Sequence, residues 1–364
     1  MKQILIIVIL LVFSLQARIL PDTVVGLTIL IDFPDEPATV ERSVLEDMLN
    51  GDNFTEYDNY GSMYQYYKDN SNGKFHYKNI VTDYIGVSGN ILSYDVFDTT
   101  LHSAQVLIKE ALDKLELSGF DFSTITTANG EAVALNVLYA GNFRSKSYAL
   151  FPHQDFLDNT PVHGGITFNQ YQITNIGNEP EVGFIVHENG HLLFEWPDLY
   201  ASVDQHSYGV GYYSLMSTTN AKIPQPPNPY FKFLAGWIDT VDITGVPYGS
   251  EYTLYPNDTV AYVYRKNHHY PDDNTGYFFL EYKKKEGWSS SIPDEGLAVW
   301  RIYTNGDNSF KANPNFVDLV QADGLDDLGN RVNRGDDGDL FKTGDVLNDT
   351  TSPDAIWYTY FGGN

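Results

Sequence analysis

Short apolar runs and segments with helical spacing of apolar residues alternate along the first half of the chain. Residues 24–33, VVGLTILIDF, are rich in β-branched side chains and predict a buried strand. Residues 102–117 carry apolar side chains three and four positions apart, which predicts an amphipathic helix. The other predicted elements of this half are strands at 74–77 and 132–139 and helices at 40–50 and 62–68. This alternation favours a layered fold of strands and helices.

The pattern changes from about residue 244 onward. Short runs with alternating residue types, separated by turn signals, appear at 261–264, 277–282 and 297–302, which is typical of an all-β module. A chain of 364 residues also suits two domains, because single cores stop growing at about 250–300 residues. The sequence therefore predicts an α+β domain over residues 18–243 and a sandwich-like β domain over residues 244–364.

The first 17 residues have the pattern of a secretory signal peptide. Lys2 precedes an apolar run from Ile4 to Phe13, and Ala17 supplies a small residue at a cleavage position. The run is shorter than the roughly 20 residues that span a bilayer, although a signal anchor that is never removed is an alternative. No later segment is apolar enough to cross a membrane. We therefore expect a secreted protein without stable membrane insertion.

The composition of the chain excludes some kinds of functional site and some partners. The chain has no cysteine, which excludes disulfides, thiolate catalysis and cysteine-zinc sites. Its net charge of −26 argues against nucleic acid as a partner and favours hard cations such as Ca²⁺. Asp336, Asp337 and Asp339 belong to an acidic region interleaved with Gly and Asn, where carboxylates from one loop can converge on calcium. A solvated acidic surface is the alternative interpretation.

One five-residue string carries the strongest chemical signal, His-Glu-Asn-Gly-His at 187–191. A helix is expected from near Glu181 to just before Pro197, and positions four apart on a helix share a face. His187 and His191 can therefore reach one cation, while Glu188 can face a water molecule on that cation. Two neutral imidazoles, an open coordination position and a nearby base are what a zinc hydrolase requires.

A hydrolytic zinc needs a third protein ligand from outside this helix. Asp198 is the first candidate, because Pro197 ends the helix and lets the chain turn back toward the imidazoles. Glu195 is the alternative if the helix ends a turn earlier. His206 and Glu251 are further candidates, in an irregular segment and in a β-like region respectively.

The segment HENGHLLFEWPDLY at 187–200 is similar to the zinc signature of secreted immune-inhibitor-A-type metallopeptidases, within the metzincin clan. The segment 209–217 resembles the Met-turn of that clan, which implies that Met216 lies beneath the metal. Further likeness, in the same order, is found at 30–35, 71–74, 229–237, 295–300 and 318–324, so the resemblance spans roughly residues 24–345. It implies a metzincin-like catalytic domain with a mixed sheet and an active-site helix, and it favours calcium in the acidic region.

The chain departs from the family spacing in one place. The family has Gly three residues after the second His and Asp six residues after it. Here Phe194 occupies the Gly position and Asp198 lies seven residues after His191, as if one residue were inserted. Tyr212 and Tyr213, in the Met-turn-like segment, either donate a hydrogen bond to the oxyanion of the substrate or serve only in packing.

The sequence thus predicts a secreted zinc-dependent endopeptidase that acts on protein or peptide substrates. Glu188 would be the general base, with Zn²⁺ held by His187, His191 and Asp198. Two alternatives remain open at this stage. One is a catalytically inactive binding protein on a protease-like fold, and the other is a zinc amidase of another substrate class. The sequence does not fix the oligomeric state, and a monomer is the default expectation.

Overall fold

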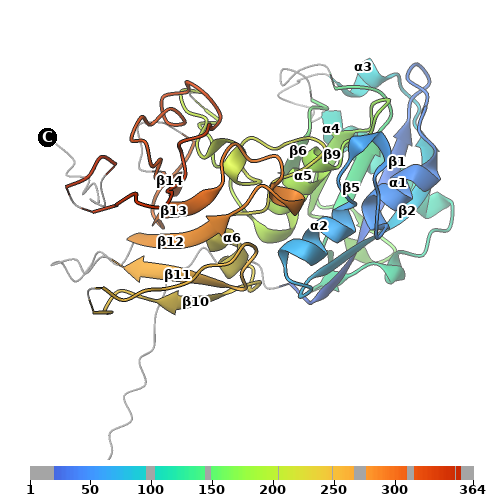
Figure 1. The fold of residues 1–364 in the computed structure, drawn as a ribbon. Helices are drawn as coiled ribbons and strands as arrows, with labels where there is room; N and C mark the ends of the chain where they lie inside the picture. Colours follow the sequence, from blue (N-terminus) through green and yellow to red (C-terminus); the bar gives the residue numbers. More distant parts are fainter. Residues whose placement is uncertain are drawn as a thin grey trace, which may run out of the picture.

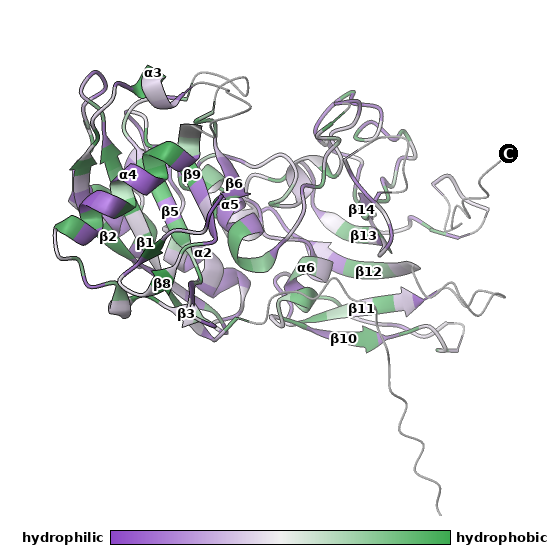
Figure 2. Cartoon of the chain, turned by 180° about the vertical axis from the view of Figure 1, so that it is seen from behind, coloured by the Kyte–Doolittle hydropathy of each residue, from purple (hydrophilic) through white to green (hydrophobic). Residues whose placement is uncertain are grey.

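The computed structural model describes residues 20–95, 103–143, 149–203, 205–247, 249–265, 276–309, 315–348 and 350–353. The predicted signal segment, residues 1–17, lies outside the described residues. The two halves of the described chain each contain a five-stranded sheet, and the two sheets lie next to each other (Figure 1). Figure 2 shows hydrophobic residues in the strands of both sheets.

The first sheet has the strand order β2-β1-β5-β9-β6. Its four parallel strands are β1 (Thr23–Asp32), β2 (His76–Gly86), β5 (Leu135–Tyr139) and β9 (Gln170–Asn175). The edge strand β6 (His153–Phe156) runs antiparallel to β9. The predicted mixed sheet is therefore confirmed, and the chain belongs to the α+β class.

Helices cover both faces of this sheet. On one face lie α1 (Arg42–Asn50), α2 (Met63–Asn70) and α5 (Val182–Phe194), which pack against β1 residues such as Leu30. The other face is covered by α3 (Ile91–Tyr94) and α4 (Ser103–Leu117), which pack against Leu27, Ile29 and Ile31 of the same strand. Successive side chains of a strand point to opposite faces, so β1 supplies apolar residues to both cores and is buried on both sides.

Smaller elements complete the first half. A four-stranded sheet has the order β3-β4-β8-β7 and is formed by Thr127–Ala128, Glu131–Ala132, Ile166–Thr167 and Val162–His163. Short 3₁₀ turns occupy Glu56–Asp58, Phe122–Thr124, Gly211–Tyr213 and, in the second half, Gly287–Ser289.

The second sheet has the order β10-β11-β12-β13-β14. Its strands are Asp239–Asp242, Val260–Arg265, Gly276–Lys283, Gly296–Tyr303 and Val317–Leu319, of which the first two pair parallel and the rest antiparallel. It begins before the predicted boundary at residue 244.

The predicted sandwich is wrong for the described residues, whose second half forms one sheet with no partner sheet facing it. The helix α6 (Pro229–Leu234) covers one side of this sheet instead and contacts β12. Its Tyr230 and Phe231 share a continuous core with Phe279 and Phe316 of the sheet region and with Val186 of α5. This shared core provides the burial that a second sheet would otherwise supply.

Candidate metal centre

The helix α5 holds the His-Glu-Asn-Gly-His string in the middle of the molecule. It begins after Glu181, as predicted, and continues through Phe194. Nearly every residue of the helix is buried, which fixes its orientation on several sides at once. Its first turn is fixed by a backbone hydrogen bond from Gly183 N to Ala221 O at 2.7 Å. The two histidines therefore project from a rigid element rather than from a loop.

A buried polar network anchors the helix through Asn189, between the two histidines. The hydroxyl of Tyr77 on β2 donates to Asn189 Oδ1 at 2.9 Å, and Asn189 Nδ2 donates to Asn136 Oδ1 on β5 at 2.9 Å. Asn136 also accepts from Gln172 Nε2 on β9 at 3.0 Å. Buried amides are costly unless they are paired, and these hydrogen bonds to three strands specify one position for the helix on the sheet.

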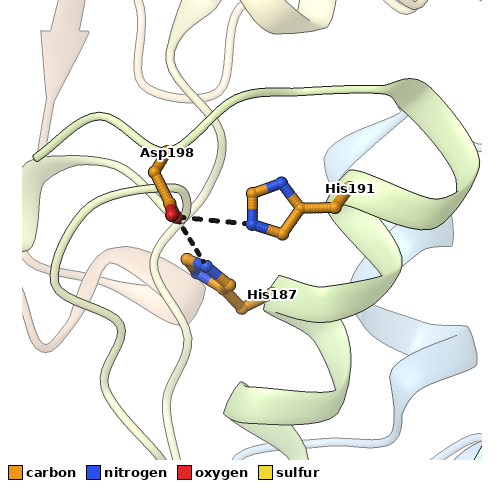
Figure 3. Close-up of side chains that lie close together, drawn as sticks. All are labelled: His187, His191 and Asp198. Atoms are coloured by element: carbon orange, nitrogen blue, oxygen red, sulfur yellow. Dashed lines mark hydrogen bonds and ion pairs between the residues drawn. The ribbon is translucent and has the colours of Figure 1, made fainter. Parts of the chain in front are cut away.

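His187, His191 and Asp198 converge at one point, as Figure 3 shows. Asp198 Oδ1 lies 3.1 Å from His187 Nε2 and 3.3 Å from His191 Nε2. A tetrahedral zinc site with ligand bonds of about 2.0–2.1 Å has ligand-to-ligand distances of about 3.3–3.4 Å. The spacing of the carboxylate oxygen to each imidazole nitrogen therefore matches the edges of such a site, and the donor set of two imidazoles and one carboxylate fits zinc.

The opposite nitrogen of each ring is held by the surrounding chain. His187 Nδ1 lies 3.0 Å from Leu215 O and 2.9 Å from Thr219 Oγ1. His191 Nδ1 lies against Trp196 O. A carbonyl acceptor at Nδ1 selects the tautomer with the proton there, which leaves Nε2 free as a metal ligand. Thr219 and Trp196 were not predicted as contributors to the site.

The electrostatics of the cluster favour a cation. Burial alone lowers the pKa of His187, but the hydrogen bond to Asp198 and the charges of Glu188 and Asp198 raise it from 6.5 to about 9. Burial raises the pKa of Asp198, yet its hydrogen bonds to His187 and His191 hold that pKa far below the ordinary range. The carboxylate thus stays ionised among the imidazoles. A proton satisfies this negative charge in the metal-free cluster, and a divalent cation can replace the proton.

The end of α5 explains the departure from the family spacing. Glu195 is the C-cap residue and adopts a left-handed conformation with φ of 56°, the role that Gly usually fills. Asp198 follows this turn by three residues, as Asp follows Gly in the family spacing. The left-handed turn at Glu195 ends the helix, and Asp198 reaches both histidines from beyond it. Glu195 is exposed and takes no part in the cluster, so the structure favours Asp198 over it.

Met216 packs against the helix at Gly190, directly between the two histidines in sequence. A Cβ placed on Gly190 would lie 2.6 Å from Met216 Sδ, so only Gly allows this approach. Met216 is fully buried, and its neighbour Leu215 accepts from His187. Met216 therefore contacts the histidine-bearing helix one residue before His191, and its role in a Met-turn stays a prediction.

We expect Gly190→Ala to destabilise the metal-free protein by up to about 2 kcal/mol. Overpacking costs about 1–3 kcal/mol, whereas the better helix propensity of Ala returns about 1 kcal/mol. Urea unfolding of the single variants and of the double variant Gly190→Ala/Met216→Ala measures the coupling. The double variant should be destabilised by less than the sum of the single changes, because removing Met216 Sδ relieves the clash. A Gly190→Ala protein more stable than wild type contradicts this packing.

The three residues of the cluster line a cleft of about 620 Å³. Glu188, which is 8% exposed, lines the cleft together with His187 and His191. Phe151 and Pro152, just before β6, line the cleft together with His153 and Gln154 of that strand. Tyr200 and Tyr208 line it from the segment after α5, and Arg331 and Arg334 from the second half of the chain. The cleft is therefore open to a ligand larger than water and carries both apolar and charged groups.

Of the two interpretations of Tyr213, the structure favours the packing role over the oxyanion role. Its hydroxyl donates to Asp339 Oδ2 at 2.9 Å and to Asp336 O at 3.1 Å, so it points into the second half of the chain. Tyr212 does not line the cleft either. The tyrosine beside the cluster is Tyr200, which is hydrogen-bonded to Asp198, and burial together with that carboxylate raises its pKa far above the ordinary value.

The remaining candidate ligands lie elsewhere. His206 and Glu251 are exposed and do not belong to the cluster. In the acidic region, carboxylate oxygens of Asp323, Asp336 and Asp339 lie within 4.8 Å of one another. The structure corrects one member of the predicted calcium group.

Asp337 is exposed and pairs with Lys342 at 3.2 Å, so Asp323 takes its place in the acidic group. Asp339 is only 1% exposed. Burial, followed by the charges of Asp336 and Asp323, raises the pKa of Asp339 from 3.8 to about 6 despite its hydrogen bonds.

No protein-family model matches the chain, and no curated protein matches it either. Within the described residues, no helix combines the length and the apolar character needed to cross a membrane. The function must therefore be argued from the site.

Proposed function

We propose that the chain is a secreted zinc-dependent endopeptidase. The observation that carries the proposal is the convergence of His187 Nε2, His191 Nε2 and Asp198 Oδ1 in a cleft that Glu188 also lines. Three N/O ligands and an accessible position are typical of catalytic zinc, whereas structural zinc sites are closed by four protein ligands. The fixed Nδ1 partners of both rings support a metal-binding role, because metal-ligating histidines are usually oriented in this way.

The chemistry follows from the residues around the cluster. Zinc, when bound, supplies a Lewis acid that polarises the scissile carbonyl and lowers the pKa of a water molecule. The carboxylate of Glu188 accepts a proton from water in the cleft and returns a proton to the leaving amine. Its position next to His187 on a rigid helix keeps it at the cleft wall without joining the ligand cluster. Tyr200 holds Asp198 in place by a hydrogen bond.

The edge strand β6 suits an extended peptide. Leu157 N donates to Asn169 O in the β6–β9 pairing. Backbone groups alternate in direction along a strand, so the N–H and C=O groups of the odd-numbered residues of β6 point toward β9. The backbone N–H and C=O of Gln154 therefore point away from the sheet, and Gln154 lines the cleft. A substrate strand can add to this edge, which no described strand of the chain occupies, with its scissile bond over the metal cluster. This favours peptide hydrolysis over hydrolysis of a small amide.

The resemblance to immune-inhibitor-A-type peptidases and the metzincin clan belongs to the same proposal. The buried Met216, which packs against Gly190 of the histidine-bearing helix, and the mixed sheet with its antiparallel edge strand support it. Secretion is proposed on the signal-like residues 1–17 alone. An inactive binding protein is the rival, and the intact cluster with Glu188 in the cleft argues against it.

A combined metal and activity assay tests the proposal. The purified chain without residues 1–17 should contain about one zinc per molecule and cleave denatured casein, and a chelator should abolish cleavage until zinc is restored. Zinc without cleavage of any protein would instead favour an amidase of another class. Absence of both zinc binding and cleavage would favour the inactive binding protein.

We propose in addition that Asp323, Asp336 and Asp339 hold calcium, as expected for hard carboxylate oxygens. Calcium at ten times its Kd should then stabilise the protein by about 1.4 kcal/mol, seen as a rise in Tm. Asp339→Asn should remove this rise, while the exposed neighbour Asp337→Asn should keep it. A Tm that calcium leaves unchanged in the wild type argues for a solvated acidic surface instead.

A further inference from the structure

Two arginines from the second half of the chain face the candidate active site. Arg331 and Arg334 lie in the segment after β14 and line the same cleft as His187 and Glu188. Figure 1 shows this segment beside the loop that follows α5. Among the described residues that line the cleft, the acidic side chains are Glu188 and Asp198. With a divalent cation bound to the cluster, those two negative charges are compensated, and the arginines leave the cleft with an excess of positive charge.

Both guanidinium groups lie over one aromatic ring. The Cζ atoms of Arg331 and Arg334 are 5.3 Å and 4.5 Å from the centroid of the Tyr208 ring. Stacking on an aromatic face orients a guanidinium and leaves its N–H groups at the edge available for a planar acceptor. Tyr208 also lines the cleft, so the stacked groups and the metal cluster share one space.

The segment that carries the arginines is held firmly. Tyr208 N donates to Leu328 O at 3.0 Å, and Tyr212 N donates to Arg334 O at 2.9 Å. A Cβ on Gly211 would lie 2.3 Å from Arg334 O, which shows how closely the two segments approach. Arg331 itself adopts a left-handed conformation with φ of 58°, which is unfavourable for any residue but Gly and is often found at functional sites.

The arginines are not occupied by carboxylates of the described chain. Neither guanidinium forms an ion pair within 4.0 Å with a described Asp or Glu, although the chain has 48 acidic residues. Arg331 donates instead to the carbonyl of Gln205. The net charge of −26 repels an acidic ligand on average, and a pair of cations in the cleft offsets that repulsion locally.

We propose that Arg331 and Arg334 form a specificity pocket for an acidic side chain of the peptide substrate, Asp or Glu, close to the scissile bond. This proposal rests on the proposed peptidase function and names its substrate class. A carboxylate is planar and accepts two parallel N–H donors, which is the geometry that a guanidinium offers. Two arginines beside one tyrosine ring would therefore recognise the carboxylate of Glu and not the neutral amide of Gln.

Matched fluorogenic peptides test the pocket. Glu is scanned through each position on both sides of the cleaved bond in an otherwise neutral peptide, and each peptide is compared with its Gln counterpart. At one position Glu should raise kcat/KM by about tenfold to a hundredfold over Gln, the range expected for charge-assisted hydrogen bonds. The double variant Arg331→Gln/Arg334→Gln should bring the two values together, and Arg331→Glu/Arg334→Glu should reverse the preference toward Lys.

Arg265→Gln is the matched control. Arg265 also lies over a tyrosine ring, 5.3 Å from the centroid of Tyr277, but it belongs to β11 and does not line the cleft. Its substitution should leave the Glu preference unchanged. Equal cleavage of Glu and Gln peptides at every position by the wild type, or an unchanged preference in the double variant, would overturn the pocket.

A binding measurement separates this proposal from the peptidase proposal. Fluorescence anisotropy of the intact Glu and Gln peptides on zinc-loaded Glu188→Gln protein reads the pocket without turnover. Tighter binding of the Glu peptide, lost on substitution of both arginines, supports the pocket even if the wild type cleaves no peptide. Equal binding of both peptides overturns it, whatever the wild type cleaves.

Discussion

Glu188→Gln is expected to lower kcat/KM for peptide cleavage by about 10²–10⁴-fold while zinc content stays at the wild-type value. The amide has nearly the same shape as the carboxylate but cannot accept a proton from water, and general-base catalysis accounts for a factor of this size. Glu188 lines the cleft and is outside the ligand cluster, so its substitution leaves all three proposed zinc ligands in place. Initial rates with a fluorogenic peptide and zinc by atomic absorption give the two readouts.

Glu181→Gln serves as the control for this variant. Glu181 is the half-buried residue that precedes the first turn of the same helix, away from the cleft lining. Its substitution should leave both rate and zinc content unchanged. Full activity of Glu188→Gln would remove Glu188 from the mechanism, and loss of zinc would assign it to metal binding.

The local periodicity of apolar residues predicted the main elements of the first half. The run at 24–33 became β1, and the amphipathic pattern at 102–117 became α4. The apolar residues of both elements recur at regular intervals along the chain, and this spacing can be seen in the sequence itself. The predicted end of the motif helix before Pro197 was also confirmed, because the ring of proline excludes helix continuation.

Strands β6 and β9 were missed because their patterns are not hydrophobic. Gln172 and Thr174 of β9 are buried, yet they face the polar network around Asn136 rather than an apolar core. Alternation of polar and apolar residues in 170–175 was the available signal. It predicts that the polar residues face solvent, whereas here they are buried. His153 and Gln154 of β6 are half-exposed on a short edge strand, which carries little signal in any sequence.

Residues brought to the site by tertiary packing were beyond prediction from spacing. Tyr213 lies in the predicted Met-turn-like segment, but its hydroxyl donates a hydrogen bond to Asp339 in the second half of the chain. Arg331 and Arg334 reach the cleft only because that half packs against the loop after α5. The sequence alone shows neither the direction of a tyrosine hydroxyl nor which distant cation enters a cleft.

Asp198→Asn is expected to weaken zinc binding more than about 100-fold. Loss of a residue that merely orients a ligand costs about 10–100-fold in metal affinity, and loss of a charged ligand should exceed that. In the metal-free protein the same change should lower the pKa of His187 below about 9, because the Asp198 hydrogen bond and charge that raise it are removed. Competition titration with a zinc chelator measures the affinity, and an NMR titration of the imidazole measures the pKa.

Glu195→Gln is the variant to compare with Asp198→Asn. Glu195 and Asp198 both follow His191 by a few residues, and only one of the two carboxylates can be the third zinc ligand. Glu195 is exposed at the left-handed C-cap, so its substitution should leave zinc affinity and the His187 pKa unchanged. A lowered His187 pKa with unchanged zinc affinity in Asp198→Asn would make Asp198 a charge partner of the histidines and not a ligand. Loss of zinc in Glu195→Gln instead would move the third ligand to Glu195, and α5 would then have to end earlier when metal binds.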